Sequence, residues 1–257
     1  MTYPEKKLTQ AVILAAGKGT RMNSDLPKVL HKIAGKPMIL YLLETLEKTS
    51  LEKIVVVVGY GKEQVMETVT DWAKSVTGIQ IVFSEQIEQF GTGHAVLSAK
   101  KHLVEDEQYL LVLLGDVPFI KPDTISEAFE TLTKSGVSSV VLSTKLNDPT
   151  GYGRIIRNGN GNIQSIIEEK DATDVDKKVD EVNTGIFIFN NTDLWNCIDE
   201  LAAENSQKEY YLTDMVKILN KNTKTVGTYF SKDANQFRGI NSKEQLLEVE
   251  EEIQVSS

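Results

Sequence analysis

The sequence has little cysteine, histidine or proline: one, three and six residues in 257. Because Cys197 is the single cysteine, an internal disulfide is impossible, and a metal cluster on several thiolates is excluded. The sequence also lacks an apolar run near the roughly 20 residues that a membrane-spanning helix needs. We therefore expect no membrane partner.

Positive charge is also in the minority. There are 28 Lys and Arg residues against 37 Asp and Glu residues, which gives a net charge of −9. A protein that binds nucleic acid through its phosphates needs a basic surface, so we expect no nucleic-acid partner. The first ten residues are polar and of mixed charge, without the apolar core of a signal peptide, so we expect a cytoplasmic protein.

The first half of the chain alternates short apolar runs with helical patterns. The run 54–58 (IVVVV) is continuous and β-branched, which is typical of a strand buried on both faces of a parallel sheet. This alternation predicts an α/β fold with helices on both faces of a sheet. We expect strands over residues 11–15, 54–58, 79–83, 109–114 and 138–142, and helices over residues 38–47, 63–73, 94–102 and 126–134.

The second half is richer in strands. The sequence Asn158-Gly159-Asn160-Gly161 predicts a hairpin turn between strands over 153–157 and 163–167, because Asn-Gly pairs supply positive φ angles. Ser242-Lys243-Glu244-Gln245 has the spacing of a capping box, and apolar residues follow at helical spacing, so a C-terminal helix is expected. We also expect strands over residues 181–189 and 225–230, and a helix over 212–219.

A glycine-rich loop, Gly17-Lys18-Gly19-Thr20-Arg21-Met22, directly follows the first expected strand. Such a turn exposes backbone N–H groups that can bind phosphate. It is not a P-loop, because no Gly-Lys-Ser/Thr follows its first glycine at the required spacing. It does not match the dinucleotide fingerprint either, because Met22 replaces the third glycine and the second parallel strand ends at Gly59-Tyr60, without an acid.

The segment 17–36 is basic within an acidic chain, with a local charge of +4. Arginine binds phosphate as a planar fork, and lysine binds it as a point charge. A solvated basic loop is the plain alternative, but in open α/β sheets ligands bind outside the carboxyl ends of the strands, and this position favours an anion site. The basic residues are Lys18, Arg21, Lys28, Lys32 and Lys36, and the one acid is Asp25.

These residues resemble a known family. Leu14-Ala15-Ala16-Gly17-Lys18-Gly19-Thr20-Arg21-Met22 with Leu26-Pro27-Lys28 resembles the signature of the sugar-phosphate nucleotidylyltransferases. More narrowly, the chain is similar to the N-terminal uridylyltransferase domain of bacterial bifunctional N-acetylglucosamine-1-phosphate uridylyltransferase/glucosamine-1-phosphate acetyltransferases. Further matching motifs, in family order, begin at Glu88, Gly115, Gly151, Glu168, Asn183, Glu209 and Gly239.

The resemblance implies a Rossmann-like mixed, mainly parallel sheet of the nucleotide-diphospho-sugar transferase type, with a small β-rich sugar-binding part. It implies one domain over residues 1–257. The nucleotide-binding part covers about 1–120, the sugar-binding part about 121–241, and a C-terminal helix 242–257.

The family's reaction joins UTP and N-acetylglucosamine-1-phosphate to give UDP-N-acetylglucosamine, a peptidoglycan precursor for the bacterial cell wall, and pyrophosphate. An oxygen of the sugar phosphate attacks the α-phosphorus. That phosphate is already anionic near neutral pH, because its second pKa is about 6, so no general base is required. Catalysis should depend on positioning and on neutralising charge.

The resemblance also implies roles for individual residues. Arg21 and Lys28 would contact the triphosphate as catalytic groups. Asp116 and Asn241 would hold Mg2+, a hard ion that prefers oxygen ligands. The nucleotide-binding residues would be Leu14, Ala15, Ala16, Gly17, Gln86, Gly91, Thr92 and Gly115, and the sugar-binding residues Gly153, Glu168, Asn183 and Thr213.

Plain structural interpretations remain open for several of these positions. Asp116 precedes Val117-Pro118 and would also suit a turn. Asn241 could simply precede the cap of the last helix, and Glu168 could be a surface residue. His94 begins a helical pattern, and we favour a structural role for it.

The sequence departs from the bifunctional relatives in two ways. Only 16 residues follow Asn241, without the six-residue repeat of their left-handed β-helix, so we expect no acetyltransferase domain and a monomer or dimer rather than a trimer. Leu114 stands where many members carry an aromatic residue. Two alternative functions remain open. The chain could be a nucleotidylyltransferase for another sugar phosphate or nucleoside triphosphate, or a non-catalytic regulatory protein that binds nucleotide sugars.

Overall fold

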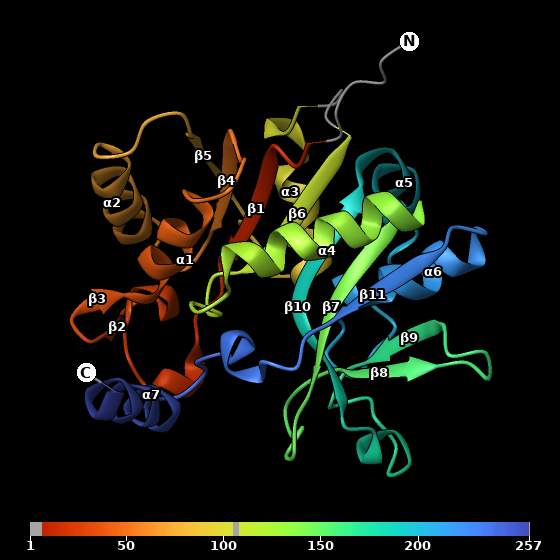
Figure 1. Cartoon of the computed structure of the whole chain (residues 1–257). Coiled ribbons are helices and arrows are strands. Elements are labelled where there is room, and N and C mark those ends of the chain that lie inside the picture. The colour runs from red at the N-terminus through yellow and green to blue at the C-terminus, as the bar shows by residue number, and fades with distance from the viewer. Residues whose placement is uncertain (1–6, 105–107, 257) are drawn as a thin grey trace.

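The computed structural model describes residues 7–104 and 108–256, and its centre is a nine-stranded sheet (Figure 1). The strand order is β11-β7-β10-β6-β1-β4-β5, and β8 pairs with β9 and β10 beside this path. The strands are β1 (Gln10–Ala15), β4 (Lys53–Val58), β5 (Gln80–Glu85), β6 (Tyr109–Leu114), β7 (Ser139–Lys145), β8 (Arg154–Arg157), β9 (Ile163–Ile167), β10 (Glu181–Asn190) and β11 (Val226–Phe230).

The sheet is mixed and mainly parallel, as the sequence analysis predicts. Strands β6, β1, β4 and β5 run parallel to one another, and β11 runs parallel to β7. Strand β10 is antiparallel to both β6 and β7 and joins the two parallel groups. This arrangement leaves the carboxyl ends of β1 and β6 side by side at one edge, which is where ligands bind in such sheets.

Helices cover both faces of the sheet (Figure 1). In β4, Ile54, Val56 and Val58 face one apolar cluster, while Val55 and Val57 face the other, which explains why this strand is apolar throughout. On the first face lie α1 (Met38–Leu46), α2 (Lys62–Ala73) and α4 (Pro122–Ser135), and on the second α3 (Thr92–Ala99), α5 (Asn191–Cys197) and α6 (Met215–Lys221).

Strands β8 and β9 form the predicted hairpin at the side of the sheet. The Asn158 side chain closes its turn by accepting hydrogen bonds from the backbone N–H groups of Asn160 at 3.0 Å and Asn162 at 3.1 Å. Gly161 has a φ of 82°, a left-handed angle that glycine adopts without strain. Strand β8 also pairs with β10 at Val182, so the hairpin is joined to the main sheet.

The last helix, α7 (Lys243–Ser256), packs against a small hairpin of β2 (Lys32–Ile33) and β3 (Lys36–Pro37). Ser242 Oγ accepts a hydrogen bond from the Gln245 N–H at 3.3 Å, as the capping-box pattern predicts. The Gln245 side chain, however, accepts from the Asn241 N–H at 2.7 Å, one residue before the cap. The helix therefore fixes the backbone of Asn241.

Several local expectations differ from the structure. The β2–β3 hairpin was not expected, because two-residue strands carry no periodicity. The helix expected over 94–102 spans Thr92–Ala99 and continues as a 3-10 turn, and the helix expected over 212–219 begins as a 3-10 turn. The 3-10 turns are Thr20–Met22, Lys28–Leu30, Lys100–His102, Asp176–Lys178, Ile198–Glu200, Leu212–Asp214 and Ala234–Phe237. Among the described residues, no helix has the length and apolarity to cross a membrane.

Candidate active site

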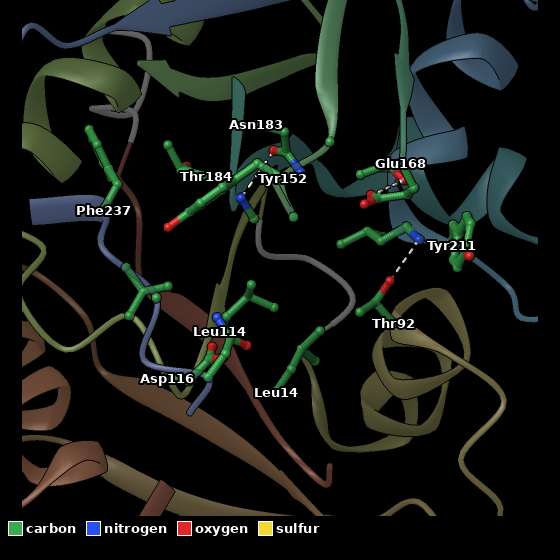
Figure 2. Close-up of a pocket in the computed structure, with 18 of the residues that line it drawn as sticks. Leu14, Thr92, Leu114, Asp116, Tyr152, Glu168, Asn183, Thr184, Tyr211 and Phe237 are labelled. Atoms are coloured by element: carbon green, nitrogen blue, oxygen red, sulfur yellow. Dashed lines mark hydrogen bonds between the residues drawn. The ribbon is translucent and has the colours of Figure 1, made fainter. Parts of the chain in front are cut away.

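Two adjoining pockets open at the carboxyl ends of β1 and β6, each with a volume of about 280 Å³. We call the first the loop pocket, because the segment that follows β1, including Ala16 and Gly17, lines it. The second is the hairpin pocket, because Gly153 and Glu168 at the ends of β8 and β9 line it (Figure 2). Both pockets share Leu14, Thr92, Leu114, Asp116 and Glu209, so ligands in the two pockets would meet beside Asp116.

Nearly all the predicted nucleotide-binding residues line the loop pocket. The exception is Gly115, which lines neither pocket. Its N–H donates to the Leu14 carbonyl at 3.0 Å, and a Cβ there would lie 2.9 Å from Val29 Cγ1. Gly115 therefore holds the ends of β6 and β1 together. The lining residues are Leu14, Ala15, Ala16, Gly17, Gln86, Gly91 and Thr92, together with the predicted catalytic Lys28.

Gln86 is buried and held in one orientation at this pocket. Its Nε2 donates to the Gly91 carbonyl at 3.1 Å and lies 3.0 Å from His94 Nδ1. His94 thus supports Gln86, in agreement with the structural role we favour. Gly91 has a φ of 104°, and a Cβ there would lie 2.7 Å from the Tyr210 carbonyl oxygen. The missing side chain at Gly91 is thus required by its contact with Tyr210.

That contact belongs to a backbone junction between residues 90–93 and 209–212. The Tyr210 N–H donates to the Phe90 carbonyl, and the Gly93 N–H donates to the Tyr210 carbonyl, both at 2.7 Å. The Leu212 N–H donates to Thr92 Oγ1 at 2.9 Å (Figure 2). These bonds bring the first half of the chain, at Thr92, against the segment that carries Thr213.

All four predicted sugar-binding residues line the hairpin pocket: Gly153, Glu168, Asn183 and Thr213. Thr213 Oγ1 donates to Glu168 Oε1 at 3.0 Å, and the Asn183 N–H donates to the Gly153 carbonyl at 2.8 Å. A Cβ at Gly153 would lie 3.0 Å from Ile166 Cγ2 and 3.2 Å from Glu168 Oε1, so a side chain there would press on the pocket wall.

The Glu168 carboxyl has a perturbed acidity. Burial raises its pKa, and the nearby carboxylates of Asp214, Asp171 and Glu209 raise it further, while the hydrogen bond from Thr213 lowers it. A carboxylate in this position accepts hydrogen bonds from neutral donors such as hydroxyl or amide groups. It repels a phosphate, so this end of the pocket suits the uncharged part of a ligand.

A cluster of opposite charges lies at the boundary of the pockets. Lys28 Nζ contacts the Asp116 carboxylate and donates to Asn241 Oδ1 at 2.6 Å. Arg21 Nη2 donates to the same Asn241 oxygen at 2.8 Å. The Ile240 N–H donates to the Asp116 carbonyl at 3.0 Å, which places Asn241 beside Asp116. The structure therefore brings together all four residues that the resemblance assigns to catalysis and metal binding.

The chemistry of this oxygen pair fits a divalent cation. The oxygens of Asp116 and Asn241 already converge on one positive group, the Lys28 ammonium. Mg2+ is bound by few protein oxygens and completes its coordination with water and phosphate oxygens. Residues 7–104 and 108–256 contain no group of three or more His, Cys, Asp or Glu side chains arranged for a metal.

Sequence reasoning missed several residues that line the hairpin pocket. Tyr152 lines this pocket together with Asn183 and Thr184 (Figure 2), and burial raises the pKa of its phenol. Tyr152 is the second residue of the matching motif that begins at Gly151, and that motif was the signal that could have identified it. Gln207 Nε2 donates to the Tyr211 hydroxyl at 2.6 Å, but nothing in the sequence pairs these two side chains. The other missed lining residues include Thr184, Phe237 and Gln245.

Residues 11–182 match the MobA-like NTP transferase domain. The chain belongs to this family. The match begins in β1 and ends in β10, so it includes the whole loop pocket except Glu209. The basic segment 17–36 and Asp116 lie within the matched region, while Asn183, Thr213 and Asn241 lie beyond it.

Curated relatives extend the likeness beyond this domain. The chain is 45% identical over 237 residues to the bifunctional protein GlmU of Carboxydothermus hydrogenoformans, and 42% identical over 241 residues to that of Clostridium novyi. These alignments cover 92% and 94% of this chain and 51% of each relative. The chain therefore spans about half the length of the curated relatives that it matches.

Solved structures share the fold of this MobA-like NTP transferase at lower identity. UDP-glucose pyrophosphorylase in complex with UDP-glucose superimposes with a TM-score of 0.79 at 19% identity, covering 97% of this chain and all of that one. HddC from Yersinia pseudotuberculosis, complexed with GMP-PN, gives a TM-score of 0.70 at 20% identity, covering 96% of this chain and all of that one. These likenesses confirm the nucleotide-diphospho-sugar transferase type of fold.

The contacts of Lys28 lead to a prediction about metal binding without nucleotide. Lys28→Met should raise the affinity for Mn2+ alone, used as a probe, by about tenfold, or about 1.4 kcal/mol, because the ammonium holds the oxygens of Asp116 and Asn241 and repels a second cation. Titration calorimetry checks this. Lys18→Met, in the same loop but against the Tyr60 ring, is the control. Unchanged or weaker Mn2+ binding by Lys28→Met would contradict the prediction.

The raised pKa of Glu168 predicts a pH-dependent stability. Because the pKa of Glu168 in the folded protein lies above its ordinary value of 4.5, the ionised carboxylate destabilises the fold. The free energy of unfolding therefore falls as the pH rises from about 4.5 through the raised pKa. Glu168→Gln should remove this loss, so its advantage over the wild type should grow with pH. Urea unfolding midpoints from pH 4.5 to 8 test this, with exposed Glu67→Gln as control. A difference independent of pH would refute it.

Proposed function

We propose that the chain transfers uridylyl from UTP to N-acetylglucosamine-1-phosphate, giving UDP-N-acetylglucosamine and pyrophosphate. One observation carries the proposal: the two pockets meet at Asp116, with Lys28 and Arg21 beside it and the Glu168–Thr213 pair at the far wall. The identity of 40–45% to the GlmU proteins over more than nine-tenths of the chain supports it. The proposal concerns the half of those relatives that the chain matches.

In the proposed reaction, the loop pocket takes the nucleotide. Backbone groups of residues 14–17 bind the nucleotide and its phosphates, while Gln86, Gly91 and Thr92 read the uracil edge. The fixed orientation of Gln86 supports this role, because an amide that is already ordered loses little conformational freedom when a base binds.

The hairpin pocket takes the sugar phosphate. Glu168, Asn183 and Thr213 supply acceptors and donors for hydroxyl and amide groups, which suits an N-acetylhexosamine. Gly153 contributes its backbone and leaves room for the sugar. The phosphate of the sugar then faces the shared boundary at Asp116, close to Lys28 and Arg21.

The chain's own groups act by position and by charge. Lys28 and Arg21 neutralise the charge on the phosphates and align the attacking oxygen with the α-phosphorus. The sugar phosphate needs no base, and no histidine lines either pocket among the described residues. Mg2+, held by Asp116 and Asn241, would supply further charge neutralisation when bound.

The remaining features of the proposal concern the setting of the enzyme. We infer that it works in the cytoplasm, where UTP is made, and that its product enters the supply of peptidoglycan precursors.

A substrate panel tests the proposed pair. Purified protein with Mg2+ should release pyrophosphate at least tenfold faster from UTP and N-acetylglucosamine-1-phosphate than from CTP, dTTP or GTP, or with glucose-1-phosphate or N-acetylgalactosamine-1-phosphate. Coupled detection of pyrophosphate measures the rates. No turnover with the first pair and good turnover with another would reassign the substrate. Binding of UDP-N-acetylglucosamine without any turnover would favour a regulatory protein.

Asp116→Ala tests the catalytic boundary between the pockets. It should lower kcat by about 10² to 10³-fold, because the carboxylate that orders Lys28 and would hold the metal is lost. The fold should survive, since the hydrogen bond between Ile240 and residue 116 uses the backbone. Circular dichroism melting checks stability, and surface Asp71→Ala is the control. An unchanged kcat at saturating Mg2+ would remove Asp116 from this role.

A further inference from the structure

The proposed function does not explain why the guanidinium of Arg154 is buried. Arg154 is 2% exposed and heads the largest fully buried side chains of the described residues. Its Nε has no hydrogen-bond partner. Burying a charged group with an unsatisfied donor costs free energy, and apolar residues of similar size often replace buried ion pairs without loss of stability. A contribution to the stability of the fold therefore does not explain why this position is an arginine.

Arg154 begins β8 at the point where three strands meet. It pairs with Ile167 of β9 and with Val182 of β10. Each of these three residues has a neighbour in the sequence that lines the hairpin pocket. Gly153 precedes Arg154, Glu168 follows Ile167, and Asn183 follows Val182. Any shift at Arg154 would therefore move three pocket residues together.

The side chain of Arg154 also holds the segment that precedes β8, at Gly151 and Tyr152. One arm of the guanidinium, Nη1, donates to the Tyr152 carbonyl, and the other, Nη2, lies 2.8 Å from Glu169 Oε2. The same Glu169 oxygen accepts the Gly151 N–H at 3.3 Å. The guanidinium of Arg154 thus connects Tyr152, the residue before Gly153, with Glu169, the residue after Glu168. Glu169 itself lines neither pocket.

We propose that Arg154, through Glu169, is a positioning residue that sets the spacing between Gly153 and Glu168 across the hairpin pocket and thereby determines the affinity for the sugar phosphate. This rests on the proposed function, because the hairpin pocket is taken as the sugar site. A lysine keeps the charge but cannot hold two partners as a planar fork, so it cannot replace Arg154.

Steady-state kinetics of Arg154→Lys and Glu169→Gln test the proposal. Both should raise KM for the sugar phosphate by about ten- to a hundredfold, since a small misplacement of binding groups is costly, while KM for the nucleotide changes less than twofold. Arg157→Lys is the matched control: it lies on the same strand, and its guanidinium pairs with Glu181 at 2.6 Å. It should leave both KM values unchanged.

Glu169→Gln keeps the test decisive if Arg154→Lys does not fold, because Glu169 is partly exposed and a glutamine there keeps the shape of the side chain. Equal increases in both KM values, or no change for the sugar phosphate in a folded variant, would overturn the proposal. The kinetics use the substrate pair that the wild type prefers in the panel. A failure of the N-acetylglucosamine assignment therefore appears in the wild type, and a failure of this proposal appears only in the variants.

Discussion

The site depends on the contact of the Lys28 ammonium with the oxygens of Asp116 and Asn241. Lys28 lies in the basic segment 17–36, Asp116 follows β6, and Asn241 precedes α7. Asp116 is 88 positions from Lys28 in the sequence, and Asn241 is 213 positions from it. Each alone would be an unpaired charge or amide at the edge of a sheet. Together they satisfy one another, and the Ile240–Asp116 backbone bond fixes their spacing. Helix α7 then holds Asn241 through Gln245, so the C-terminal helix is part of the site's framework.

A second long-range junction gives the site its other half. The backbone bonds between residues 90–93 and 209–212 place Thr92 of the loop pocket against the segment that carries Thr213. Gly91 and Gly93 permit this approach, because a Cβ at either position would collide with Tyr210 or Leu201. The junction brings Thr92 and Glu209 to the boundary that both pockets also share at Leu14, Leu114 and Asp116.

The sequence predicts the sheet well because the buried strands are continuous β-branched or apolar runs, as in β4 and β6, and their burial on two faces leaves that signature. The candidate site residues are predicted from motifs, because the family resemblance assigns roles to particular side chains within them. Gly115, which is predicted to bind the nucleotide, lines neither pocket, and its contacts join β6 to β1. The contacts of Gln207 with Tyr211, and of the Arg154 fork with Tyr152 and Glu169, could not be predicted, because nothing in the local sequence pattern pairs these side chains.

The charges of the two pockets are separated, and this separation has a consequence for binding. Arg21 and Lys28 lie at the shared boundary, while Glu168, with a pKa raised first by burial and then by neighbouring carboxylates, lies at the opposite wall of the hairpin pocket. A sugar phosphate that enters with its phosphate toward Glu168 meets repulsion, and one that enters with its phosphate toward Lys28 meets attraction. Although the net charge of the chain is −9, the charge therefore changes from positive to negative across the hairpin pocket. Under the proposed function, this gradient orients the acceptor before the reaction, so that its phosphate oxygen already faces the nucleotide.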